Sequence, residues 1–327
     1  MRRFLAIIPL AALAVITWAR AERPPPPPPG LVVAVRPIAP RGNPAAHLGA
    51  FRLQGVWQLA SRSAGFGSYS TLLAMPDGTL LAFSDSGNFL HFSPPGSRGE
   101  VLAGGDLLSG YPTAKAGRDV ESATRDSATG RVWLGLEGTN AVFRLAPDLR
   151  PLNRVRPPAI ARWGVNSGPE AMVRLADGRF VLLREAFAGW FESRRHDAVV
   201  FDGDPTAGAR SWHFVFEGPR GFSPTDMTQL PDGRLLILMR RLIWPMPQRF
   251  AGRLVIADPR GIRPGRTLKA RTVARIASSL PVDNFEGIAA VPTPDGRLTV
   301  WIISDDNFSS FQRSLLWKLS VDPRALY

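Results

Sequence analysis

One unit occurs five times along the chain: an apolar segment, a turn that contains glycine, and a second apolar segment. The five predicted hairpins span Ser70 to Phe83, Glu121 to Leu136, Glu170 to Leu183, Asp226 to Met239 and Glu286 to Ile303. Because the connecting turns are short, the two strands of each hairpin must be antiparallel. A further apolar segment, such as Ala141 to Leu145, predicts a third strand in each unit, and in some units a fourth follows, such as His213 to Glu217.

Radial repetition of four short antiparallel strands is the architecture of a β-propeller. We therefore predict an all-β protein with five blades, whose turn glycines lie 48 to 63 residues apart. The last unit lacks a fourth strand, and Phe51 to Ala60 is a predicted strand without a unit of its own. If this strand completes the last blade, the ring closes and no sheet edge is left open. A sixth blade from Leu102 to Lys115 stays open, and a β-sandwich is the less favoured alternative.

The chain begins with features typical of a secretory signal. Two arginines are followed by an apolar run from Phe4 to Trp18 and by the small-x-small sequence Ala19-Arg20-Ala21. We predict a signal peptide over residues 1–21 and a periplasmic or secreted protein with no stable membrane insertion after cleavage. A membrane anchor is the alternative, but the run is shorter than the roughly 20 residues that a span requires. Six prolines follow, and we expect a Pro-rich spacer over 22–48, a propeller domain over 49–322 and a tail over 323–327.

Composition restricts the partners of the protein. The chain has no cysteine, so an exported domain must be stabilised by packing alone and any metal must bind to oxygen atoms. The net charge of +13 could attract phosphorylated substrates or anionic polymers of the cell envelope. Since nearly all of the basic residues are arginine, a bias in codon usage explains the charge equally simply. No basic run exceeds two residues, so we expect no nucleic-acid partner. We expect a monomer.

Polar residues gather where the first strand of each hairpin begins and the second ends, and these places share one face of a propeller. The strand starts carry Ser68, Asp119, Glu121, Asn166, Glu170, Thr225, Asp226, Asp283, Asn284 and Glu286. The strand ends carry Asp85, Glu137, Glu185, Arg240, Asp305 and Asp306. Crowded carboxylates require protons, arginines or a hard cation. The alternative is that these acids accept backbone hydrogen bonds and pair with arginine, which would hold the blades together.

We assign candidate roles on this predicted rim. The catalytic candidates are Glu121, Glu170, Asp226, Glu286 and Asp305. The candidate metal ligands are Asp85, Asp119, Glu286, Asp305 and Asp306. The candidate substrate-binding residues are Arg118, Asn166, Arg240, Trp190 and Trp244, the last two in loops that overhang the rim as pocket walls or as a lid without a ligand. The chain has no G-x-S-x-G, H-E-x-x-H or Walker A motif, and aspartates in the Asp-Gly turns are given no catalytic role.

Several motifs resemble those of the phytase-like, esterase-like family of exported bacterial proteins. They are Asp283 to Ile288, Ile303 to Phe308 with Gln312-Arg313, Asn166 to Ala171, and Phe83 to Gly87, and the similarity runs from Leu53 to Leu319. The resemblance implies a β-propeller that hydrolyses phosphate or carboxylic esters, with a cation, Ca²⁺ by analogy with propeller phytases, on the acidic face. The D-D-P-A segment of those phytases is missing, and Ser86 follows Asp85 where an arginine is more familiar. Phytate itself is therefore not supported as the substrate.

Two functional hypotheses follow. In the first, the exported protein is an ester hydrolase whose rim binds a divalent cation that activates water, while Arg118 or Arg240 binds an anionic group of a small-molecule substrate. In the second, it is a non-catalytic periplasmic propeller that binds a ligand or a protein, and its acids are structural.

Overall fold

The computed structural model describes residues 31–40, 42–96, 101–109, 111, 117–164, 166–189, 192–245, 248–277 and 279–326, without the side chains of 244 and 245. The predicted signal peptide and the run of prolines lie outside these residues. Among the helices that the structure describes, none has the length and hydropathy to cross a membrane.

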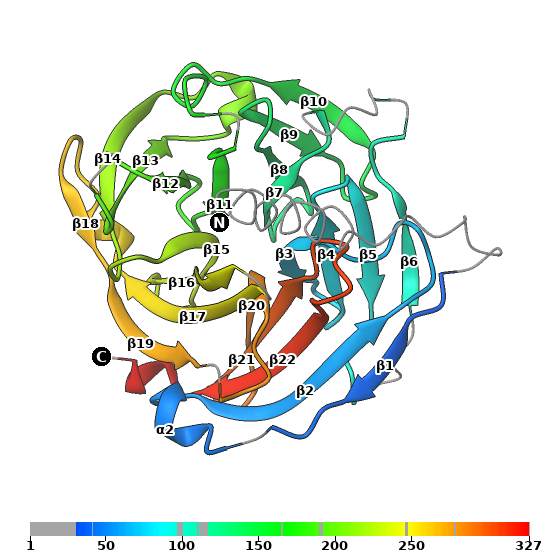
Figure 1. Cartoon of the computed structure of the whole chain (residues 1–327). Helices are drawn as coiled ribbons and strands as arrows, with labels where there is room; N and C mark the ends of the chain where they lie inside the picture. The colour runs from blue at the N-terminus through cyan, green and yellow to red at the C-terminus, as the bar shows by residue number, and fades with distance from the viewer. Residues whose placement is uncertain are drawn as a thin grey trace, which may run out of the picture.

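The strands of the described residues form five sheets arranged around a central axis (Figure 1). Blade 1 contains β3 (Tyr69–Ala74), β4 (Leu80–Ser84), β5 (Asn88–Phe92) and β6 (Val101–Asp106). Blade 2 contains β7 (Val120–Arg125), β8 (Val132–Leu136), β9 (Ala141–Leu145) and β10 (Pro151–Val155). Blade 3 contains β11 (Pro169–Arg174), β12 (Phe180–Phe187), β13 (Arg195–Phe201) and β14 (Ser211–Glu217). The short strand β18 (Thr267–Lys269) adds to blade 3 in parallel with β14.

Blade 4 contains β15 (Ser223–Gln229), β16 (Leu235–Pro245), β17 (Gln248–Ala257) and β19 (Arg271–Ile276). Blade 5 contains β20 (Asn284–Pro292), β21 (Leu298–Asp305) and β22 (Ser314–Val321), and is completed by β2 (Arg52–Ala60) and β1 (Ala34–Pro37). Short helical segments lie at α2 (Ala45–Leu48), η2 (Pro205–Ala207), η3 (Pro259–Gly261) and η4 (Pro323–Ala325). The predicted five-bladed propeller is confirmed.

The ring closes through strands from the two ends of the domain. β2 pairs antiparallel with β22, from Arg52 opposite Ser320 to Leu59 opposite Ser314 (Figure 1). This is the closure that the sequence predicts, and it gives β22 a partner on both sides. β1 then pairs with β2, so ordered structure of blade 5 begins within the stretch that we expected to be spacer. The segment considered for a sixth blade instead supplies β6, the outer strand of blade 1.

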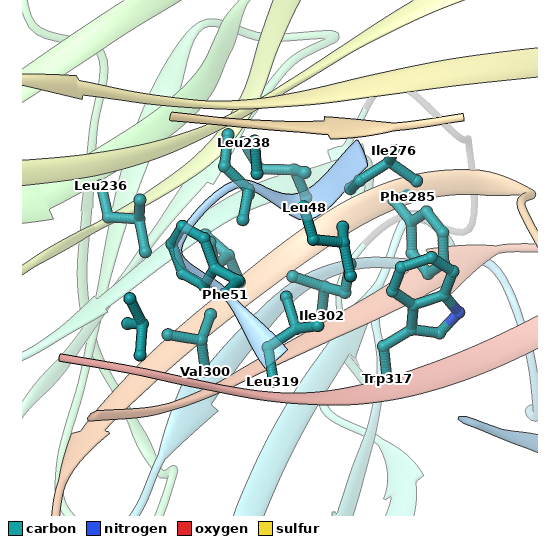
Figure 2. Close-up of a cluster of buried hydrophobic side chains, with 14 of the residues drawn as sticks. Leu48, Phe51, Leu236, Leu238, Ile276, Phe285, Val300, Ile302, Trp317 and Leu319 are labelled. Carbon is teal, nitrogen blue, oxygen red and sulfur yellow. The ribbon is translucent and has the colours of Figure 1, made fainter. Parts of the chain in front are cut away.

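The hydrophobic core lies between neighbouring blades. In Figure 2, Leu236 and Leu238 of blade 4 face Val300 and Ile302 of blade 5, and Phe51 lies between them. Similar clusters of buried side chains fill the other interfaces between blades. Since each central strand is covered on both faces, it must be apolar at consecutive positions rather than at alternate ones. The sequence of β16 shows this, because Leu235 to Met239 are all fully buried.

Candidate functional site

Each inner strand carries a β-bulge close to its first residue. The pairing of the inner strand with the next strand skips one residue in every blade, between Val120 and Ser122 in β7, for example. The skipped residues are Ser70, Glu121, Glu170, Thr225 and Glu286. A bulge leaves its extra residue out of the ladder and redirects the side chain, and bulges are common beside active sites. Three of the five equivalent positions therefore deliver a glutamate to the same end of the channel.

A second set of equivalent positions lies where the second strand of each blade ends its pairing with the first. In each blade, the residue before the bulge is paired with a residue of the second strand, and the next residue of that second strand belongs to this set. The five residues are Asp85, Glu137, Glu185, Arg240 and Asp305. Asp119, the residue before β7, is buried beside them and its carbonyl accepts the amide hydrogen of Glu137. We call the eight carboxylates the acidic rim: Asp85, Asp119, Glu121, Glu137, Glu170, Glu185, Glu286 and Asp305.

Glu137 is the residue that two groups of carboxylates share. Oxygen atoms of Asp119, Glu121 and Glu137 lie within 4.8 Å of one another, and so do those of Glu137, Glu170 and Glu185. The two groups join blade 2 to blade 3. Our sequence analysis placed Glu137 and Glu185 on the predicted rim but gave them no role. Their position one residue after the pairing ends is the signal that identifies them.

Burial and mutual repulsion make these carboxyl groups hold protons. Burial, followed by the charges of Glu286, Asp119, Asp85 and Glu137, raises the pKa of Glu121 well above its usual value. Burial likewise raises the pKa of Glu170, and the charges of its carboxylate neighbours add to that effect. Burial raises the pKa of Glu137 too, while its hydrogen bond with Glu170 lowers it. The hydrogen bond between these two carboxyl groups requires a proton on one of them.

Arg240 provides positive charge inside the acidic rim. Its Nε atom lies 3.0 Å from Oε1 of Glu286, and its Nη2 atom lies 3.2 Å from Oε1 of Glu185. Burial opposes the charge on Arg240, but Glu286, Glu185, Glu170 and Asp305 outweigh it and raise the arginine's pKa. Burial raises the pKa of Glu286 to about 7, although Arg240 acts in the opposite direction. One guanidinium facing eight carboxyl groups leaves the rim with excess negative charge once they ionise.

Asn284 supplies a neutral oxygen to the same place. Its Nδ2 atom donates to Oε1 of Glu286 at 2.6 Å and to Oδ2 of Asp305 at 3.2 Å. These two acceptors fix the orientation of the amide, and Oδ1 is buried without a hydrogen-bond partner among the described residues. A hard cation such as Ca²⁺ prefers carboxylate and amide oxygens. The donor set of the rim therefore fits such a cation.

The structure removes Asp226 from the rim. The bulge of β15 falls on Thr225, so Asp226 is one residue past the position equivalent to the three glutamates, and a shift of one residue turns a side chain to the other face. Its Oδ2 atom accepts hydrogen bonds from Ile288 N at 2.9 Å and from Thr71 Oγ1 at 3.1 Å. Asp226 thus connects the inner strands of blades 4, 5 and 1, and its predicted catalytic role stays a prediction.

Asp306 also has a structural position rather than the predicted metal-binding one. Its Oδ1 atom accepts from Ser68 N at 3.0 Å and from Phe308 N at 3.1 Å, while Oδ2 accepts from Ser314 Oγ at 2.7 Å. Gly67, with φ of +108°, approaches this carboxylate so closely that a Cβ atom there would clash. Both oxygens are therefore occupied in joining blade 5 to blade 1.

Arg118 does not reach the acidic rim either. Its guanidinium forms an ion pair with Asp106 and donates to the carbonyl oxygens of Ser86 and Leu108. Its nitrogens therefore contact the loops of blade 1, and the prediction that it binds substrate stays a prediction. Asn166 is exposed in the loop before β11 and is not part of the carboxylate groups.

The two aromatic candidates cannot be placed. Trp190 lies outside the described residues, and of Trp244 only the backbone is described. That backbone corrects one expectation, because the segment predicted as an overhanging loop continues the β16–β17 hairpin, with Trp244 opposite Arg249. His196 is fully buried, and its ring nitrogens lie 2.9 and 3.2 Å from the carbonyl oxygens of Glu185 and Phe222. It connects blade 3 to the loop before blade 4.

Of the remaining candidate metal ligands, Asp119 alone belongs to the two close carboxylate groups. Glu286 is paired with Arg240, and Asp305 accepts from Asn284 and, at 2.6 Å, from Asn307 N. Asp85 lies close enough to raise the pKa values of Glu121, Glu286 and Asp305 after the larger effect of burial on each. The candidate metal centre is therefore at blades 2 and 3, whereas the sequence analysis had centred it on blade 5.

Comparison with known proteins identifies a family. The model of the phytase-like family, described as esterase-like activity of phytase, matches residues 64–308. Among curated proteins, none matches the chain. A PQQ-bound aldose sugar dehydrogenase from Streptomyces coelicolor is 12% identical with a TM-score of 0.45, over 90% of this chain and 100% of its own. A streptogramin B lyase is 13% identical with a TM-score of 0.40, over 86% of this chain and 100% of its own. Likenesses this distant carry no functional argument.

Proposed function

Because the chain belongs to the phytase-like family, described by its esterase-like activity, we propose that it is a hydrolase of phosphate or carboxylic esters whose acidic rim binds Ca²⁺. The observation that carries the proposal is that Glu137 belongs to two groups of three carboxylates, both at the bulged starts and ends of neighbouring blades. When they are ionised, these carboxylates repel one another, so a divalent cation would replace the protons that the site holds without a metal.

The residues that would hold the cation are those of the two groups, namely Asp119, Glu121, Glu137, Glu170 and Glu185. A bound Ca²⁺ would activate water and neutralise the negative charge that develops on the ester. Asp226 is buried, and its carboxylate joins the inner strands of blades 4, 5 and 1.

Glu286 is the candidate for proton transfer. Its pKa of about 7 means that both protonation states are populated near neutral pH, which is the condition for a general acid or base. Arg240 and Asn284 hold its Oε1 atom in place. In this role the carboxylate would accept a proton from the attacking water, and the carboxylic acid would donate one to the leaving alcohol.

Charge distinguishes the two substrate classes. Without a cation the rim repels an anionic phosphoester, because Arg240 already pairs with Glu286 and Glu185. A phosphoesterase activity should therefore depend strictly on the cation, whereas hydrolysis of a neutral carboxylic ester should depend on it less.

The experiment uses the mature protein with p-nitrophenyl phosphate and p-nitrophenyl butyrate, each with Ca²⁺ or with EDTA. We expect Ca²⁺-dependent hydrolysis that Glu137→Gln reduces by at least about a hundredfold, the scale of losing a group that acts in the transition state. Asp295→Asn, which changes an exposed turn aspartate at the other end of the blades, is the matched control. No hydrolysis across these and further esters in the presence of Ca²⁺ would refute the proposal.

A non-catalytic binding propeller is the second candidate. It is favoured by Asp306, a residue predicted for this face whose carboxylate joins blade 5 to blade 1. Calcium binding without turnover of any ester would support this alternative. For either function we propose an exported, periplasmic or secreted location, on the basis of the signal sequence at residues 1–21.

A further inference from the structure

Three arginines on adjacent strands of blade 4 lie outside the acidic rim. Arg253 of β17 is directly opposite Arg275 of β19, and Arg241 of β16 is opposite Ala251, two residues from Arg253. Residues directly opposite or two apart share a face of the sheet. We call Arg241, Arg253 and Arg275 the arginine triad. Arg240 points to the acidic rim, and successive side chains of a strand point to opposite faces of the sheet. The triad, which includes Arg241, is therefore on the other face of blade 4.

A buried aromatic ring positions two of the three guanidinium groups. The Cζ atoms of Arg241 and Arg253 lie 4.8 and 4.5 Å from the centroid of the Phe222 ring. Phe222 is 2% exposed and packs in the core between blades 3 and 4. Gly221, with φ of +75°, lies against Arg241, whose Cδ atom is 3.4 Å from the position that a glycine Cβ would take. Cation–π stacking and this close loop hold the groups in place before any ligand arrives.

The triad has no carboxylate to balance it among the described residues. Nearby arginines do find acids: Arg195 is 3.6 Å from Glu217, and Arg240 pairs with Glu185 and Glu286. Like charges directly opposite each other destabilise a sheet. Burial, followed by the charges of Arg275 and Arg241, lowers the pKa of Arg253. Three neighbouring positive charges without an acid, two of them held against Phe222, form a site that an anion would stabilise.

We propose that the arginine triad binds a phosphate-type oxyanion, carried by a free phosphate compound or by a lipid headgroup. Guanidinium groups donate parallel hydrogen bonds to phosphate oxygens, and stacking on an aromatic ring leaves the N–H groups at their edges available, apart from Nη1 of Arg253, which donates to the carbonyl oxygen of Gly252 at 2.9 Å. This site is independent of the acidic rim, because it is on the opposite face of β16 and requires no cation. The proposal therefore stands or falls separately from the proposed hydrolase function.

The first test measures binding of inorganic pyrophosphate by calorimetry in EDTA, so that no cation at the acidic rim can hold the probe. Vesicles of phosphatidylglycerol, with phosphatidylcholine as the blank, form the second arm in a sedimentation assay. We expect the unmodified protein to bind at least one probe, and Arg253→Gln and Arg275→Gln each to weaken that binding by about tenfold or more, the loss of a charge-assisted hydrogen bond.

Arg36→Gln, an exposed arginine of β1 on blade 5, is the control that removes the same charge elsewhere. It should change binding by no more than about twofold if local contacts, not net charge, hold the probe. Pyrophosphate binding alone identifies a free phosphate compound as the ligand, and vesicle binding identifies a lipid headgroup. No binding of either probe, or equal losses in the triad variants and the control, would overturn the proposal.

Thermal unfolding provides a second measurement. If the triad only stabilised the fold, the melting temperature would change in the direction opposite to the one we predict. Without an anion, Arg275→Gln should leave the melting temperature unchanged or raise it, because the variant relieves repulsion from Arg253. With pyrophosphate, the unmodified protein should gain stability and the variant should gain less. A fall in melting temperature for Arg275→Gln without an anion would show that the triad stabilises the fold by packing, and would contradict the site.

Discussion

Arg240 and Glu286 form an ion pair between blades 4 and 5, with Nε of the guanidinium 3.0 Å from Oε1 of the carboxylate. The same guanidinium reaches Glu185 of blade 3 at 3.2 Å. Blade 4 thus supplies an arginine at the position where the other four blades supply an acid. This arginine partly neutralises the rim at Glu286 and Glu185, whereas Glu121, Glu137 and Glu170 have no ion pair with an arginine among the described residues; these three belong to the candidate metal centre.

Arg240→Gln should destabilise the fold. The change leaves the buried Glu286 and the half-buried Glu185 without their cation, and breaking a buried pair costs about 3–5 kcal/mol. We expect the loss to be larger near pH 8 than near pH 5, because burial raises the pKa of Glu286 to about 7, so that near pH 5 this carboxyl group is protonated and needs no partner. Urea unfolding at the two pH values measures it. Arg179→Gln, which breaks a partly exposed pair with Asp177, should cost no more than about 1 kcal/mol, and equal costs for both variants would contradict the account.

The stability of the metal-free protein should fall as the pH rises from about 4.5 to above 7. Burial raises the pKa of Glu286 to about 7, so between these values the folded state binds more protons than the unfolded state. Stability then decreases with rising pH, by about 3 kcal/mol for this group alone if each unit of pKa is worth 1.36 kcal/mol. Partial burial acts to raise the pKa values of Asp177 and Asp232, but hydrogen bonds and charge from their arginine partners lower them. These two groups therefore change the stability of the fold only at lower pH. Urea midpoints measured in EDTA across this range would show the decrease, and a flat profile would contradict it.

Asp226→Ala should unfold or strongly destabilise the protein. Asp226 accepts hydrogen bonds from Thr71, Leu72, Met227 and Ile288, and its loss would leave these buried donors unsatisfied at about 1–3 kcal/mol each. Asp226→Asn keeps the shape and one acceptor, so it should cost less and should leave any ester hydrolysis by the folded fraction unchanged. Hydrolysis that disappears in a folded Asp226→Asn variant would contradict this structural account and support the predicted catalytic role of Asp226.

A chain that begins at residue 61 should not form a closed ring. It lacks β2, so β22 would expose an unpaired edge and the core between blades 4 and 5 would lose Phe51 and Val56. We expect aggregation or loss of the cooperative unfolding transition in calorimetry. A chain that begins at residue 31 keeps β1 and β2 and should unfold cooperatively. Equal stability of the two chains would show that closure through β2 is dispensable.

The fold was readable from the sequence because its signals are local. Each hairpin has a turn glycine at a positive φ, such as Gly78, Gly178 and Gly233, between two apolar segments. Closure by β2 followed from counting strands, since one strand lacked a blade and one blade lacked a strand. These inferences require no knowledge of where any side chain points.

The candidate site could be predicted only in part from the sequence, because it depends on the pairing register of the inner strands. Glu121, Glu170 and Glu286 were placed together, and they do occupy equivalent bulges. Asp226 was grouped with them because it begins an apolar segment in the same way, but the bulge of β15 falls one residue earlier, on Thr225. Apolar and polar patterning does not reveal a bulge. An error of one position in the register therefore moves a side chain from the rim to the interior.

The sequence also did not show which residues form hydrogen bonds or ion pairs with one another. Asp306 and Asp119 are both aspartates at the predicted rim. The oxygens of Asp306 accept from Ser68, Phe308 and Ser314, whereas a carboxylate oxygen of Asp119 lies within 4.8 Å of those of Glu121 and Glu137. Similarly, Arg118 and Arg240 stand at comparable places, and only Arg240 reaches the rim carboxylates. These differences arise from contacts between residues far apart in the chain, which a list of positions cannot predict.

Calcium titration of the metal-free protein near neutral pH, with the released protons measured in two buffers, tests the central claim most directly. The claim is that bulged strands bring carboxylates of separate blades to one mouth, where a cation takes the place of shared protons. We predict binding of Ca²⁺ with release of protons, lost in Glu137→Gln and retained in Asp295→Asn. Absence of binding, or binding that Glu137→Gln leaves unchanged, would contradict the account.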